Sequence, residues 1–191
     1  QDFDGNYKDK TDSLTFSNGK VIFNVSGFGA LFTRMVGEGG YEYFDDYLLV
    51  NTSEYSGEKS TFEPINGSKK DTIVVKVVSL DNYPIQGALT EFLSASNKVI
   101  KGNITNDKGK SQHIKDQKIR KIKVTNLSYD DIIFDVVQGK DFLVRLAENN
   151  VIENQTVAFK VKNEDEETIS IILLTVDFDP GKDKMKSLEK L

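Results

Sequence analysis

Two short stretches, Pro84-Ile85-Gln86-Gly87-Ala88 and Asn106-Asp107-Lys108-Gly109-Lys110, decide the fold of this chain because each reads as a turn between runs of alternating apolar residues. Residues 72–78 form the run before the first turn. The resulting order is strand, tight turn, small-residue strand, polar hairpin and strand. This order is typical of an all-β sandwich.

The residue types inside these turns support the same interpretation. Pro84 fixes φ, and Gly87 allows a backbone conformation that a Cβ would disfavour. Asp107 is expected to hydrogen-bond its own backbone, and Gly109 is expected to supply a positive φ. We therefore predict that these four residues are structural turn residues.

The composition excludes several classes of site and partner. The net charge of −5 argues against a nucleic-acid partner, because neutralising phosphates requires a basic face. Basic residues cluster at 69–70 and 118–123, and we interpret both clusters as solvated strand ends. There is no Cys, which excludes disulfides, zinc–thiolate sites and thiol nucleophiles. No apolar run approaches the roughly 18 residues that a membrane-spanning helix needs.

The N-terminal part of the chain reads as a β-meander. Turn residues recur about every 8–12 positions over 5–63, a spacing typical of sandwiches and barrels. The glycine-rich stretch 37–40 is expected to break a strand as a turn. We assign the first unit to 1–66, with a linker at 64–71.

The second unit is assigned to 72–147. We expect seven strands in it, at 72–80, 88–93, 98–104, 111–114, 119–126, 131–137 and 142–146. Residues 151–178 then read as a hairpin, and 181–191 form a Lys-rich tail.

Two arrangements fit the C-terminal hairpin. A small meander has little core of its own, so residues 151–180 are expected to complete its sheet in one arrangement. The second unit is then an insertion between the two halves of one barrel or sandwich. In the other arrangement the units follow one another along the chain.

The second unit resembles a known family. Its turn Pro84-Ile85-Gln86-Gly87-Ala88, the hairpin at 105–110 and the later strand at 122–129 are similar to motifs of the carboxypeptidase regulatory-like domain, a transthyretin-like β-sandwich. This chain has Ser128 where that family usually has Gly before Tyr. The resemblance implies a non-catalytic module, since members accompany carboxypeptidase domains or precede TonB-linked outer-membrane receptors. No carboxypeptidase zinc motif accompanies it.

A fainter resemblance concerns the first unit. Gly5-Asn6-Tyr7, Leu14-Thr15-Phe16 and Gly37-Glu38-Gly39-Gly40-Tyr41 look like a lipocalin-type meander. Members of that broader class often hold apolar ligands inside a barrel. The resemblance implies a carrier of a small apolar ligand as the alternative function.

Catalytic patterns are weak in this sequence. His113 is the single histidine, so His-pair zinc chemistry is excluded and any Ser-His-Asp triad depends on it alone. The acidic clusters at 45–46, 130–131 and 164–167 lack calcium-loop spacing and are interpreted as solvated loops. We predict no catalytic, cofactor-binding or metal-binding residues.

These observations together predict a non-enzymatic binding or spacer protein. The chain starts at Gln1 rather than Met, which favours an exported protein of the bacterial cell envelope, in the periplasm or at the outer membrane. Its partner is expected to be a protein or a glycan. Phe28, Leu31 and Phe32 flank an expected turn and form the candidate interaction surface, since aromatic residues are enriched at interfaces.

Overall fold

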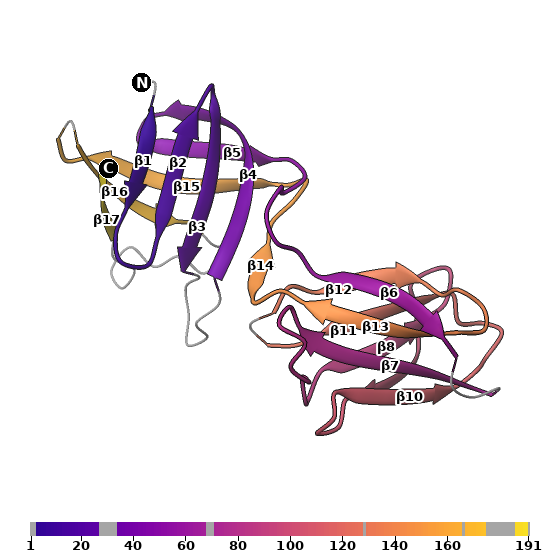
Figure 1. The fold of residues 1–191 in the computed structure, drawn as a ribbon. Coiled ribbons are helices and arrows are strands. Elements are labelled where there is room, and N and C mark those ends of the chain that lie inside the picture. Colours follow the sequence, from indigo (N-terminus) through magenta and orange to yellow (C-terminus); the bar gives the residue numbers. More distant parts are fainter. Residues whose placement is uncertain are drawn as a thin grey trace. The chain divides into compact units, whose positions relative to one another are not determined.

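The computed structural model describes residues 3–26, 34–67, 71–127, 129–165, 167–174 and 186–190. All regular secondary structure in these ranges is β-strand, so the predicted all-β class is confirmed (Figure 1). The chain forms two compact units, one from Gln1–Gly57 with Asn149–Leu191 and the other from Glu58–Glu148.

The first unit is a closed antiparallel barrel. Its sheet runs β1-β2-β3-β4-β5-β15-β16-β17 and returns to β1, and eight of the described strands form this ring. Consecutive strands are neighbours, which is up-and-down topology. β14 adds to β4 in parallel. The strands are β1 (Gly5–Lys8), β2 (Ser13–Ser17), β3 (Lys20–Ser26), β4 (Arg34–Phe44), β5 (Tyr47–Thr52), β14 (Asn149–Val151), β15 (Thr156–Asn163), β16 (Thr168–Leu173) and β17 (Lys186–Lys190).

Both ends of the chain are needed to close this barrel. β5 pairs with β15 through Val50 and Val157, and β1 pairs with β17 through Tyr7 and Lys190. Residues alternate between the two faces of each strand, which places Leu48, Val50, Phe159 and Val161 in the barrel core. The whole second unit lies in sequence between β5 and β15.

Aromatic side chains fill the barrel interior between the described strands. The ring centroids of Phe3 and Phe16 lie 4.9 Å apart, and those of Phe16 and Tyr41 lie 5.1 Å apart. Phe23 and Phe159 meet from opposite sides of the barrel at 5.4 Å. Eight strands give an interior just wide enough for side chains to fill, and here large rings occupy it.

The glycine-rich stretch 37–40 lies inside β4, so the turn expected there is wrong. A Cβ on Gly37 would lie 2.5 Å from the ring of Phe23, and one on Gly39 would lie 2.0 Å from the carbonyl oxygen of Asn51. Glycine is therefore required for close packing within a strand, not for a change of direction.

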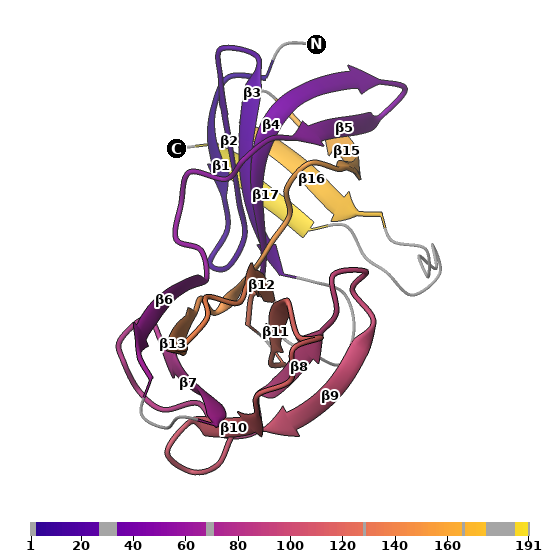
Figure 2. The ribbon, with the colours of Figure 1, turned by 90° about the vertical axis from the view of Figure 1, so that its right-hand side faces the viewer.

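The second unit is a sandwich of two four-stranded sheets, whose strands are seen in Figure 2 and whose buried side chains form one core. One sheet has the order β10-β7-β13-β6, with β7 and β13 parallel, and the other has the order β12-β11-β8-β9. The strands are β6 (Thr61–Asn66), β7 (Thr72–Ser79), β8 (Leu89–Leu93), β9 (Val99–Ile104), β10 (Lys110–Ile114), β11 (Lys121–Thr125), β12 (Ile132–Asp135) and β13 (Lys140–Leu146).

β6 departs from the sequence-based assignment. Residues 61–66 were assigned to the first unit and to a linker, but they pair antiparallel with β13. The sandwich therefore has eight described strands, where the sequence predicted seven. The ring of Phe62 stacks on Phe134 at 4.2 Å, so this strand covers the edge of the core. Pro64 is tolerated because an edge strand has one side without ladder hydrogen bonds.

The two turns that decided the fold meet at one residue, Val77. Gly87 has φ +81° and Gly109 has φ +67°. The N–H of Val77 donates to the carbonyl of Gly109 at 2.7 Å, and the N–H of Ile85 donates to the carbonyl of Val77 at 3.0 Å. The side chain that holds the hairpin is Asn106, whose Oδ1 accepts the N–H groups of Lys108 and Lys110, each at 3.0 Å. The role expected of Asp107 therefore falls to its neighbour.

Gly109→Ala is expected to destabilise the chain by about 3 kcal/mol, because strained backbone adds to a collision. A Cβ there would lie 2.3 Å from the carbonyl oxygen of Val77. Gly139→Ala is the matched control, since Gly139 has φ +75° and open space around the Cβ position. It should cost only about 1 kcal/mol. Equal losses in urea denaturation would contradict this explanation.

Fragments test the dependence of the barrel on both chain ends. Residues 58–148 are expected to give a dispersed amide NMR spectrum alone, because every described strand of the sandwich lies within them. Residues 1–57 should give a collapsed spectrum, because they lack β15, β16 and β17. A dispersed spectrum from residues 1–57 would refute this dependence.

Candidate functional site

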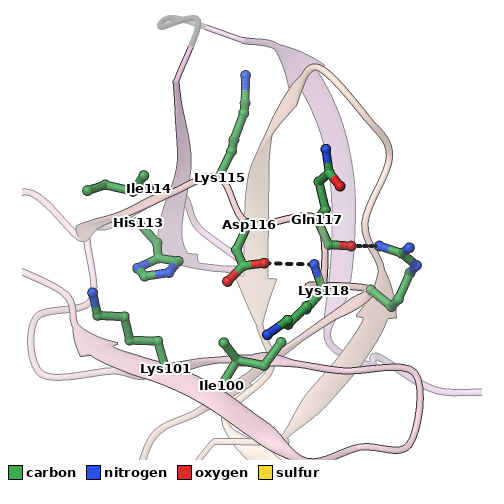
Figure 3. A pocket seen from close by; sticks show the side chains of 9 residues that line it. Ile100, Lys101, His113, Ile114, Lys115, Asp116, Gln117 and Lys118 are labelled. Atoms are coloured by element: carbon green, nitrogen blue, oxygen red, sulfur yellow. Dashed lines mark hydrogen bonds between the residues drawn. The ribbon is translucent and has the colours of Figure 1, made fainter.

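A surface depression of about 910 Å³ lies where β9 and β10 separate in the sandwich (Figure 3). We call it the β9–β10 groove, and it is lined by Ile100, Lys101, His113, Ile114, Lys115, Asp116, Gln117, Lys118 and Arg120. These residues come from β9, from β10 and from the connection that follows β10.

The path of the chain explains the shape of the groove. β9 and β10 are joined by the hairpin turn but belong to different sheets, so they diverge from that turn. The side-chain amide of Asn103 donates to the carbonyl of Gln112 at 3.0 Å and ties the two strands together at this narrow end. A smaller depression of about 320 Å³ follows the same two strands.

Positive charge dominates the groove. Its lining holds four cationic side chains, Lys101, Lys115, Lys118 and Arg120, and a single carboxylate. That carboxylate, Asp116, accepts the backbone N–H of Lys118 at 2.8 Å (Figure 3). A surface with this excess of cations attracts anionic groups.

Arg120 is held in place by backbone carbonyls. Its Nη1 donates to the carbonyl of Gln117 and, at 3.0 Å, to that of Ile119. The guanidinium is therefore oriented before any ligand arrives. Arginine oriented in this way favours planar recognition of carboxylates.

His113 lies on the inward side of β10, where only 9% of its surface is exposed. Its ring centroid is 4.8 Å from that of Phe92 on the facing sheet. Burial lowers the pKa of His113 below the ordinary value of 6.5, the charge of Lys101 lowers it further, and Asp116 opposes this. The imidazole is therefore neutral at pH 7 and forms part of the wall.

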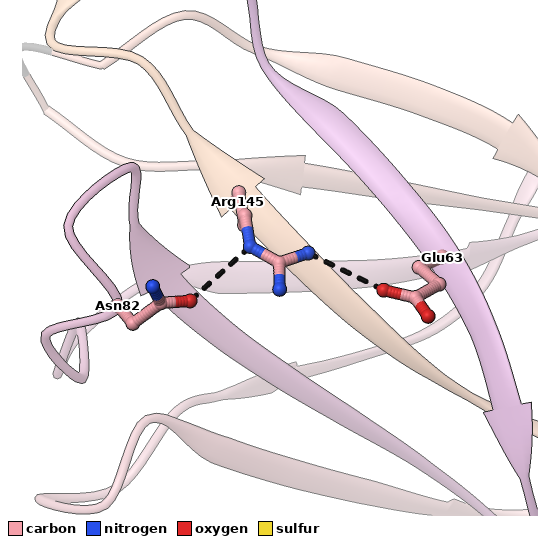
Figure 4. Close-up of polar contacts among 3 residues, drawn as sticks. All are labelled: Glu63, Asn82 and Arg145. Atoms are coloured by element: carbon pink, nitrogen blue, oxygen red, sulfur yellow. Dashed lines mark hydrogen bonds and ion pairs between the residues drawn. The ribbon is translucent and has the colours of Figure 1, made fainter.

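A second polar cluster, on the sheet that contains β13, has a structural role (Figure 4). Arg145 Nε donates to Oδ1 of Asn82 at 3.2 Å, and its Nη1 lies 3.4 Å from Oε2 of Glu63. The cluster ties β13 to β6 and to the turn after β7. Exposed pairs of this kind contribute at most about 1 kcal/mol.

The sequence-predicted site residues lie elsewhere. Phe28, Leu31 and Phe32 fall outside the described residues. Pro84, Gly87, Asp107 and Gly109 belong to the two turns of the sandwich. The basic cluster 118–123, interpreted as a solvated strand end, supplies Lys118 and Arg120 to the groove. This charge run was the one sequence signal of the groove.

Comparison of the chain with protein-family models, with curated proteins and with solved structures finds no match. In the described ranges, no helix is long and apolar enough to cross a membrane. Within the same ranges, no three His, Cys, Asp or Glu side chains are grouped so that they could hold a metal ion. The chemistry of the groove is therefore the basis for a functional proposal.

The depressed pKa of His113 predicts a pH dependence of stability. Below about pH 6.5 the unfolded chain binds a proton that the folded chain resists, so the free energy of unfolding falls as the pH falls. His113→Gln should remove this component. The urea midpoints of both proteins at about pH 7.5 and about pH 5.5 measure this component. The carboxylates contribute equally to the pH dependence of both proteins, so their contribution cancels in the comparison. Parallel losses in the two proteins would contradict the predicted shift.

Proposed function

We propose that this chain is a non-enzymatic binding protein of the bacterial cell envelope, and that the β9–β10 groove holds an anionic group of a partner protein or glycan. Lys101, Lys118 and Arg120 outnumber the single carboxylate of the groove lining, and this excess of positive charge is the observation that carries the proposal. The resemblance of 72–147 to carboxypeptidase regulatory-like domains supports a module without catalysis, in an exported protein.

The distribution of charge between the two units supports the same proposal. Residues 58–148 carry 15 basic and 12 acidic residues, a net charge of +3, although the whole chain is at −5. The barrel unit carries 10 basic and 18 acidic residues, a net charge of −8. An anionic partner is therefore attracted to the sandwich and repelled by the barrel.

A second candidate function is carriage of a small apolar ligand in the barrel. The closed ring of eight described strands favours it, because lipocalin-like barrels hold single ligands. The packing of Phe16 against Phe3 and Tyr41, and of Phe23 against Phe159, opposes it. We therefore assign the barrel a scaffold role.

Charge reversal in the groove tests the proposed function. Polyglutamate and polygalacturonate, which share carboxylates, are titrated into the full chain by calorimetry, with neutral dextran as a blank. At least one acidic polymer is expected to bind, and Lys118→Glu should weaken that binding by roughly tenfold. Raising the salt concentration should weaken it as well, because the groove is exposed.

The control reverses one charge in the barrel. Lys10→Glu changes the net charge by the same amount at an exposed position. It should leave the affinity for the polymer nearly unchanged. Equal weakening by Lys10→Glu and Lys118→Glu, or no binding of either acidic polymer, would contradict the proposed function.

A further inference from the structure

Two open strand edges border the β9–β10 groove. In the described part of the chain, β9 pairs only with β8, and β10 pairs only with β7. Depressions of about 320 and 910 Å³ follow both strands, and Asn103 and Gln112 line the smaller one. An open edge offers backbone N–H and C=O groups to an incoming strand. The groove therefore has the main-chain groups that an extended peptide needs.

Cations line the groove beside these edges. Lys101 lies on β9 and Lys118 on the connection after β10 (Figure 3), and Arg120, on the same connection, also lines the groove. Asp116 keeps its negative charge while it accepts the N–H of Lys118, so it offsets one of these three cations and leaves an excess of positive charge. An occupant that balances this charge is acidic.

Aliphatic side chains at the border of the groove favour a peptide over a glycan as its occupant. Ile100 and Ile114 line the groove, and Ile114 is 67% exposed. No Phe or Tyr occurs among the described residues that line the groove, so it lacks the flat aromatic platform on which a sugar ring stacks. Side chains of an added strand alternate between its two faces, so acidic residues on one face and aliphatic residues on the other match this border.

We propose that the partner is a protein, and that an extended acidic segment of it, with aliphatic residues at alternate positions, lies as a strand in the β9–β10 groove. Its carboxylates contact Lys101, Lys118 and Arg120, and its backbone pairs with an edge of β9 or β10. This inference rests on the proposed function and narrows its partner to a peptide.

Lys101 has a competing structural explanation. A lysine at the edge of a sheet protects that edge from pairing with other chains. If protection is its role, Lys101→Glu keeps a charged side chain at the edge, although of opposite sign, and does not alter binding. If Lys101 contacts carboxylates of the peptide, the same substitution weakens binding.

The test uses the full chain and a capped hexapeptide of alternating Glu and Val. Amide NMR is expected to show saturable shifts in β9 and β10, and Lys101→Glu should weaken the affinity by roughly tenfold. Lys10→Glu in the barrel is the matched control and should have little effect. The same peptide, N-methylated at alternate residues so that one edge loses its donors, should also bind roughly tenfold more weakly, because backbone pairing supplies affinity in strand addition.

Each other outcome overturns a defined part of the account. Equal affinity of the N-methylated peptide would overturn strand pairing, and unchanged affinity in Lys101→Glu would leave edge protection as the role of Lys101. Binding of oligogalacturonate that Lys118→Glu weakens, without binding of the hexapeptide, would overturn the peptide and leave the proposed function standing. Absence of binding by the hexapeptide, by polyglutamate and by galacturonate polymers would overturn the peptide and the proposed function together.

Discussion

The pairing of β5 with β15 is the constraint on which the rest of the structure depends. It joins residues 47–52 to residues 156–163 and closes the barrel, so the chain must leave the barrel after β5 and return to it. The chain segment between these two strands forms the sandwich, which has its own core. Because the cost of closing a loop rises only slowly with its length, an insertion of this size costs the barrel little more than a short loop.

The two units differ in whether their side chains leave space for a partner to bind. In the barrel, aromatic residues meet across the interior, and the side chains of Phe16, Phe23 and Phe159 are fully buried. In the sandwich, the sheets separate at β9 and β10 and leave a groove lined by cations. A neutral His113 forms the wall of this groove, so its positive charge comes from lysine and arginine and persists at neutral pH. We therefore attribute recognition to the sandwich and support to the barrel.

Local sequence predicted the all-β class and missed features that depend on distant contacts. The class followed from turns and alternating residues that a single segment displays. β6 was missed because all six of its residues are exposed, which leaves no alternation, and because Pro64 suggested a linker. The glycines of β4 suggested a turn because neither the ring of Phe23 nor the backbone of Asn51 is visible nearby in sequence. The groove was missed because Lys101 and Arg120 come to line one depression only after the sandwich folds.

Hydrogen–deuterium exchange of the full chain, with and without polyglutamate, tests most directly whether recognition lies in the sandwich. The account predicts slower amide exchange in peptides covering 99–104 and 110–120, which contain the strands and the connection of the groove. Peptides from β1 to β5 and from β15 to β17 should exchange at unchanged rates. Slower exchange confined to these barrel strands would contradict the account and place recognition in the barrel.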